Sequence, residues 1–219
     1  SDLQNTMIGD TVRVYLRSSV SPYAKIDSAK GFLSSAGFDS FIFNNASNGV
    51  NYYLHLKHRN GLETWSKTPQ QFSSNYLNYN FTTNANKAFG DNMILKGSKW
   101  TIYSGDVNQD GVIDIADNSL IDNDAFNFES GYIRTDLNGD GIADISDQAI
   151  ADNNAFNFVS KVTPGGALIN PEDPQDIISE NSSVNSEIKI DHDIYNRTKN
   201  QSPVIKPSEI RKQLIIKSN

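Results

Sequence analysis

The 219-residue sequence contains no cysteine, which excludes disulfide bonds, thiolate metal ligands and cysteine nucleophiles. It also lacks a run of about 18 apolar residues, so no membrane-spanning helix is expected. There is no glycine-rich phosphate loop and no serine with plausible His and Asp partners, so we do not expect an enzyme. Basic residues form no stripe with aromatic residues, which disfavours nucleic acid as a partner.

Hydrophobic residues are also scarce, at 37% of the chain with a mean hydropathy of −0.50. The length fits one or two domains, but so lean a core often needs metal ions or partners. The net charge of −7 is unevenly spread. Residues 1–103 hold 10 Lys or Arg against 6 Asp or Glu, whereas residues 104–160 hold 1 against 12. The acidic segment is therefore where a cation site is expected.

Residues 1–103 are predicted to form β-structure. Apolar and polar residues alternate in Thr11–Arg17 and Tyr52–Lys57, as in half-buried strands, and Asn60-Gly61 predicts a hairpin turn. Ser28–Leu33 fits either a short helix or a strand. Short strands at this spacing favour a β-sandwich, with the aromatic residues in its core rather than on a sugar-binding face. Further strands are predicted at Phe41–Phe43, Tyr76–Phe81, Met93–Leu95 and Trp100–Tyr103.

Residues 104–162 contain an internal repeat with a period of 30 residues. Asp106–Phe128 and Asp136–Phe158 are identical at 13 of 23 positions. Each copy has Asp at position 1, Asn at 3, Asp at 5, Gly at 6, and Asp at 9 and 12. Calcium prefers six to eight oxygen ligands, and a tight loop with ligands at alternate positions can aim them at one centre.

The spacing therefore predicts two calcium ions, one in each repeat. Position 7 supplies its backbone carbonyl and position 12 closes the ligand shell, while Gly at position 6 permits the sharp turn. Magnesium is less suitable, because it retains its waters and prefers a rigid octahedron. The predicted ligands are Asp106, Asn108, Asp110, Val112, Asp114 and Asp117 in the first loop, and Asp136, Asn138, Asp140, Ile142, Asp144 and Asp147 in the second.

The acidic segment resembles the type I dockerin repeat, a calcium loop followed by a single helix. Position 12 is Asp rather than Glu, and a strand-like segment rather than an amphipathic helix precedes Asp106. The resemblance implies helices at Asp117–Ala125 and Asp147–Ala155. Positions 10 and 11 carry Ile-Ala and Ile-Ser, where dockerins that bind cohesin typically carry a Ser/Thr pair. Residues 1–103 resemble an immunoglobulin-like module of secreted bacterial surface proteins, on the segment Gly49–Ser66.

Two segments outside these loops carry further predictions. The repeats end in Ala-Phe-Asn-Phe, and we expect all four Phe to pack between the two halves or against the sandwich. Residues 163–219 are rich in Ser, Asn and Pro, which predicts an extended tail. Its short apolar pieces would run back along its own domain or add a strand to a neighbour. These pieces are Glu187–Ile190, Pro203–Lys206 and Gln213–Lys217.

The favoured interpretation is a calcium-stabilised structural or adhesive module, secreted or at a bacterial cell surface. Its partners would be other copies of itself, joined through the tail into a filament. The alternative is an accessory region of a larger secreted enzyme, tethering it to a scaffold protein or to polysaccharide. Sequons such as Asn45-Ala46-Ser47, and the triplet Asp10-Thr11-Val12, leave glycosylation open.

Overall fold

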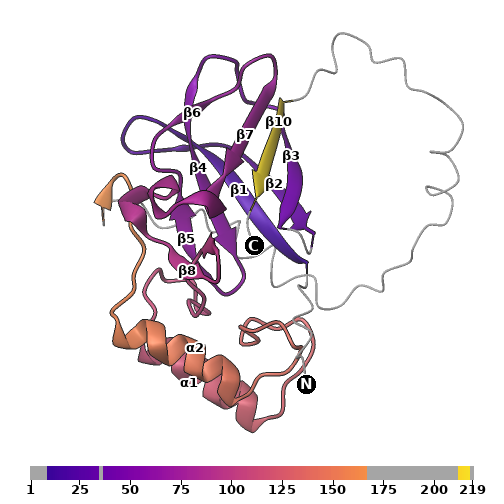
Figure 1. Ribbon diagram of the computed structural model, residues 1–219, viewed down its shortest axis with the longest axis vertical. Helices are drawn as coiled ribbons and strands as arrows, with labels where there is room; N and C mark the ends of the chain where they lie inside the picture. Colours follow the sequence, from indigo (N-terminus) through magenta and orange to yellow (C-terminus); the bar gives the residue numbers. More distant parts are fainter. Residues whose placement is uncertain (1–8, 35–36, 167–211, 218–219) are drawn as a thin grey trace, which may run out of the picture. The chain divides into compact units, whose positions relative to one another are not determined.

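The computed structural model describes residues 9–34, 37–166 and 212–217 (Figure 1). This part of the chain is mainly β, with two α-helices. The predicted pieces Glu187–Ile190 and Pro203–Lys206 lie outside the described residues. Among the helices described, none is both long enough and apolar enough to cross a membrane.

The first sheet contains five strands, and every pairing in it is antiparallel. The alternation of apolar residues explains its central strand, because Val12, Val14 and Leu16 are buried at every second position. The segment that fitted either a helix or a strand is an edge strand. The strand order is β2 (Lys25–Leu33), β1 (Asp10–Ser18), β4 (Asn51–His58) and β5 (Gly61–Trp65), and β6 (Gln70–Gln71) also pairs with β4.

The second sheet has three strands, with the C-terminal strand β10 (Lys212–Lys217) between β3 (Phe38–Phe43) and β7 (Tyr76–Asn80). Strand β10 is antiparallel to β3 and parallel to β7. Figure 1 shows it in yellow between these two strands. Of the two arrangements left open for the tail, the structure has this segment running back along its own domain.

Both sheets contribute to one buried hydrophobic cluster. Leu54 of β4 and Phe41 and Phe43 of β3 are at most 1% exposed. Trp65 is 1% exposed and stacks on His55, so it is buried in the structure, as predicted. Three 3-10 helices, Phe81–Thr83, Ala85–Lys87 and Phe89–Asp91, follow β7, and a short hairpin of β8 (Ile94–Lys96) and β9 (Lys99–Thr101) leads to the acidic repeats.

Each acidic loop is followed by a helix, α1 (Ile115–Phe126) or α2 (Ile145–Phe156), which lie side by side (Figure 1). Each helix begins two residues before the predicted start, because Asp114 and Asp144 are N-caps that accept hydrogen bonds from backbone N–H groups two residues ahead. The helices pack through a small apolar cluster of Val107, Ile121 and Ala151, with Leu137 against it.

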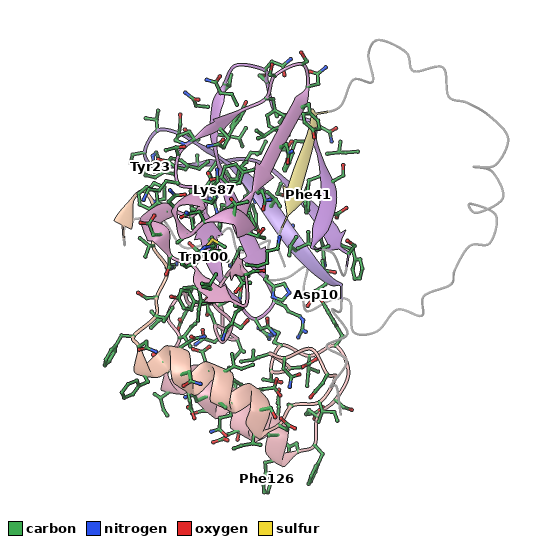
Figure 2. All side chains as sticks on the ribbon, in the orientation of Figure 1. Asp10, Tyr23, Phe41, Lys87, Trp100 and Phe126 are labelled. Atoms are coloured by element: carbon green, nitrogen blue, oxygen red, sulfur yellow. The ribbon has the colours of Figure 1, made fainter. Side chains whose placement is uncertain are left out.

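The prediction that the four repeat phenylalanines are packed is wrong. Phe126 and Phe128 are 83% and 87% exposed, and Phe156 and Phe158 are 83% and 88% exposed. Figure 2 shows the Phe126 side chain pointing away from the helices. The physical reason is their position: each pair stands at or just beyond a helix C-terminus, whereas the contact between the helices is made by the smaller residues one turn or more before it.

Candidate metal centres

The two acidic loops have nearly the same backbone conformation. Positions 4 and 6 have positive φ in both, at +62° and +89° for Gln109 and Gly111 and +80° and +87° for Gly139 and Gly141. Glycine tolerates this left-handed region without steric cost, which explains the repeated Gly at position 6. The short turns needed to bring alternate side chains to one side are therefore built into each sequence.

Each loop is held at its middle by the segment that follows a helix. Ile113 donates its N–H to the carbonyl of Val159 at 3.0 Å, and Lys161 donates to Gly111 at 2.8 Å. The second loop repeats this pairing, because Ala143 donates to Glu129 at 3.0 Å and Gly131 donates to Gly141 at 2.8 Å. The first loop thus contacts the segment after α2, and the second contacts the segment after α1, so the two repeats brace each other.

The side chains at positions 3 and 5 organise the outer part of each loop. In the first, the Asn108 amide donates to Asp110 at 2.9 Å, and Asp110 in turn accepts from the backbone N–H of Val112 at 2.9 Å. In the second loop the corresponding distances are 3.0 Å in both cases. These bonds leave the position 3 and position 5 side chains on one side of the loop, where a cation could bind.

Position 12 lies at the centre of each loop and is fully buried, with Asp117 and Asp147 both 0% exposed. One Asp117 oxygen accepts from the N–H groups of Val107 and Asn108 at 2.8 and 3.1 Å, and the other accepts from Asp114 at 3.0 Å. Asp147 accepts three equivalent bonds. In this conformation the position 12 carboxylate anchors the loop to the helix start, and its role as a metal ligand stays a prediction.

Position 1 differs between the loops. Both oxygens of Asp136 accept backbone hydrogen bonds, from Gly139 at 2.7 Å and from Gly141 at 3.1 Å. Asp106 is 2% exposed, and one of its carboxylate oxygens is buried without a hydrogen-bond partner. A buried carboxylate oxygen with no donor is costly, and a cation is the natural group to satisfy it.

The electrostatics of the loops reflect this burial. Burial raises the pKa of Asp106 from 3.8 to about 7, and the neighbouring Asp117 and Asp110 add to the shift, while a backbone hydrogen bond from Gly111 opposes it. Burial also raises the pKa of Asp117 and of Asp147, although three backbone N–H groups lower each of them. A divalent cation would reverse these effects, because it favours the ionised carboxylates.

The structure places the predicted ligands of each repeat in one loop, but it does not arrange them around a formed metal centre. Within the described ranges, no group of three or more His, Cys, Asp or Glu side chains is arranged to hold a metal ion. The reason lies in the contacts above, since the carboxylates at positions 9 and 12 face backbone N–H groups. Each carboxylate oxygen has two lone pairs, so such bonds still leave acceptor capacity at several of these oxygens.

The turn between β4 and β5 contacts both loops, which the sequence did not predict. The Asn60 side-chain amide donates to the backbone carbonyl of Asp136 at 2.8 Å, and the Asn60 backbone carbonyl accepts from the Gly105 N–H at 2.8 Å. Gln109, at position 4 of the first loop, donates at 2.6 Å to the carbonyl of Asp106 and lies 3.4 Å from that of Arg59. Asn60 is 2% exposed, so this contact is part of the packed interior.

A charged network extends the same contact toward the second loop. Arg59 lies 3.9 Å from a carboxylate oxygen of Asp136 and stacks over Tyr132 at 4.5 Å. The Tyr132 hydroxyl donates to Asp10 at 2.6 Å, and Arg59 and His58 lie 3.1 and 2.9 Å from the other Asp10 oxygen. Asp10 is labelled in Figure 2. In the sequence, Asn60-Gly61 indicates only a hairpin turn, and no pattern links it to Asp136, 76 positions away.

Comparisons with family models, with curated proteins and with solved structures find no match to this chain. The candidate site therefore rests on its own residues: two loops with the same backbone turns, matching hydrogen bonds at positions 3, 5, 9 and 12, and the same buried position 12 carboxylate.

Proposed function

We propose that the chain is a calcium-stabilised extracellular structural module, in which two calcium ions hold the acidic repeats and the repeats brace the β-structured part. In this proposal residues 1–103 are an immunoglobulin-like β-sandwich and residues 104–162 a dockerin-like pair of calcium loops. The two sheets that share one buried cluster, and the two loop–helix units in side-by-side contact, support that assignment.

The single observation that carries the proposal is the buried, unpartnered carboxylate oxygen of Asp106 at position 1 of a loop rich in oxygen ligands. Folding concentrates Asp106, Asp110 and Asp117 in one turn and withdraws two of them from water. Ionised carboxylates in that arrangement repel one another and lose hydration, so metal binding and folding of the repeats are coupled. Calcium is available outside cells at concentrations that suit such sites.

The test is thermal unfolding of the full chain in excess calcium, in excess magnesium and in chelator. Calcium should raise the melting temperature, because a ligand at 100 times its Kd stabilises the folded state by about 2.7 kcal/mol per site. Magnesium should have a much smaller effect. The matched control is Asp122→Asn, which removes an exposed carboxylate of α1 outside the predicted ligand set and should leave the calcium effect unchanged. Equal melting temperatures in calcium and chelator would refute the proposal.

A second candidate function is favoured by the exposed phenylalanines. Phe128 and Phe158 have φ of +56° and +53°, a left-handed conformation that costs a bulky residue about 1–2 kcal/mol and normally selects Gly or Asn. Both are more than 85% exposed, so packing within the described chain does not repay that cost. Their retention in both repeats supports a role in contacting a partner, as expected for an accessory region that tethers a secreted enzyme to a scaffold protein.

This candidate is tested by titrating the chain with isolated cohesin modules as the scaffold probe, and with polysaccharides. Phe128→Gly and Phe158→Gly together should abolish binding while the melting temperature is maintained. A buried phenylalanine such as Phe72 is not a suitable comparison for these exposed residues. It is 1% exposed, and Phe72→Gly would unfold the chain. Absence of binding to both classes of probe would reject the tethering role and leave the structural one.

A further inference from the structure

Strand β10 is the last described segment of the chain, yet it occupies the middle of its sheet. Residues Lys212–Lys217 pair with Phe38–Phe43 on one side, and Gln213–Lys217 pair with Tyr76–Asn80 on the other. Neighbouring strands of a sheet exchange backbone hydrogen bonds along their whole length. Among the described strands, β3 and β7 are thus joined into a sheet through β10 alone, and each has one edge paired with it.

We call the space between β3 and β7 the strand slot. Its walls carry buried core residues: Phe41 and Phe43 of β3 are 1% and 0% exposed, and Leu77 and Tyr79 of β7 are 8% and 7% exposed. Leu214 has Phe41 and Leu77 as its register partners. A slot without a strand would expose two unpaired sheet edges beside the hydrophobic core, which favours association with any matching extended segment.

Nothing in the register requires the strand to come from the same chain. The parallel pairing of β7 with β10 already spans residues 81–211, so no tight turn connects the partners. Residues 167–211 separate the last described part of the repeats from β10. A stretch of 45 residues can span up to about 150 Å when fully extended, which is enough to reach a neighbouring copy.

We propose that the strand slot accepts Lys212–Lys217 of a second copy, so that copies of this chain link head to tail. The donor segment and the slot are different surfaces of the same chain, so each copy offers one of each. Such a heterologous contact gives an open filament when its rotation does not close. The inference deepens the proposed structural role by naming the partner, and it does not depend on whether the loops bind calcium.

The complete absence of cysteine allows a direct test by disulfide trapping in the full chain. Ser40 and Ile215 are register partners, and such antiparallel pairs lie about 4.5–5.5 Å apart at their Cα atoms, within the range of a disulfide. Chains carrying only Ser40→Cys are mixed with chains carrying only Ile215→Cys, unfolded, refolded together and oxidised. A disulfide between the two chain types then forms when the strand of one occupies the slot of the other.

The matched control replaces Ile215→Cys by Lys212→Cys, whose register partner is Phe43, about 10 Å along the strand from Ser40 and beyond disulfide reach. Ile42→Cys mixed with Gln213→Cys is a second register pair, used in case the first impairs folding. Protein concentration is varied from about 1 µM to about 1 mM, because an intramolecular strand has an effective concentration of millimolar order.

We expect covalent heterodimers several times more abundant in both register pairs than in the control, increasing with concentration. Chains carrying both cysteines of one pair are run on the same gel, and they test whether the strand pairs within its own chain. If they form only intramolecular disulfides while the mixed single variants give no more heterodimer than the control, the strand serves its own chain and the proposal is overturned. No register-dependent disulfide in either format would overturn it as well. A calcium-independent melting temperature would leave this result untouched.

Discussion

Replacing Asp106 by Asn should have opposite effects on stability with and without calcium. In chelator at pH 8, Asp106→Asn removes a buried negative charge from a carboxylate that has one buried oxygen without a hydrogen-bond donor. Burial raises the pKa of this carboxyl from 3.8 to about 7, which corresponds to a destabilisation of about 4 kcal/mol for the ionised form, at about 1.4 kcal/mol per pKa unit. This is an upper limit, because a metal-free loop can open locally and rehydrate the carboxylate.

The sign follows from proton linkage. A carboxyl with a raised folded-state pKa stabilises the fold fully below its unfolded pKa, and this stability is lost as the pH rises through the folded pKa. Metal-free wild type should therefore lose stability between about pH 4 and pH 7, whereas the Asn variant should not. In chelator, the difference in free energy of unfolding between the Asn variant and wild type should fall to roughly 1.5 kcal/mol at pH 5.

Thermal unfolding followed by circular dichroism measures both effects. In chelator at pH 8 we expect the Asn variant to melt higher, by about 2–4 °C for each kcal/mol gained. In calcium it should melt lower than wild type, since it has lost a charged ligand. The control is Asp110→Asn, which removes a ligand at an exposed position and should lower stability in calcium without raising it in chelator. A lower melting temperature for Asp106→Asn in chelator at pH 8 would refute the reasoning.

Three further predictions address the contact at the β4–β5 turn, the exposed phenylalanines and the proton linkage of the metal. Asn60→Ala should lower the free energy of unfolding, measured in urea, by about 1–3 kcal/mol, because it leaves the Asp136 carbonyl without its buried donor. The control Gln71→Ala, at an exposed position, should lower it by less than about 0.5 kcal/mol. Phe158→Gly should leave the free energy of unfolding unchanged or raise it by up to about 1 kcal/mol, and a loss above 2 kcal/mol would show that this side chain is packed after all. Calcium affinity of the first loop should fall about tenfold between pH 8 and pH 6 in calorimetric titrations, since the Asp106 carboxyl must lose its proton to bind, and a pH-independent affinity would contradict the raised pKa.

The strands were predictable where apolar residues recur at every second position. The alternation in Thr11–Arg17 and Tyr52–Lys57 marks strands β1 and β4, because the apolar residues at every second position are buried in the core, although Tyr15 and His55 on the opposite face are buried as well. The segment Ser28–Leu33 was ambiguous for a physical reason. It belongs to an edge strand with only Leu33 buried, so its sequence has no strong apolar period.

The two loop–helix units were placed to within two residues at the helix starts, because position-specific chemistry leaves a local pattern, and calcium binding by the loops stays a prediction. The contacts that anchor them to the β-structured part were not, because Arg59, Asn60 and Tyr132 meet only after folding. The burial of the repeat phenylalanines was predicted wrongly from hydrophobicity alone. Their exposure depends on where each helix ends and on which small residues make the contact between α1 and α2, and the sequence pattern specifies neither.

The most direct test of the account is a calorimetric calcium titration of the full chain after chelator treatment. Two calcium ions should bind per chain, with proton release at pH 7 and a melting temperature that rises with calcium concentration. Asp106→Asn combined with Asp136→Asn should lose both the heat and the shift in melting temperature. No heat of binding, together with the same melting temperature in calcium and in chelator, would contradict the central claim that the acidic repeats are calcium sites.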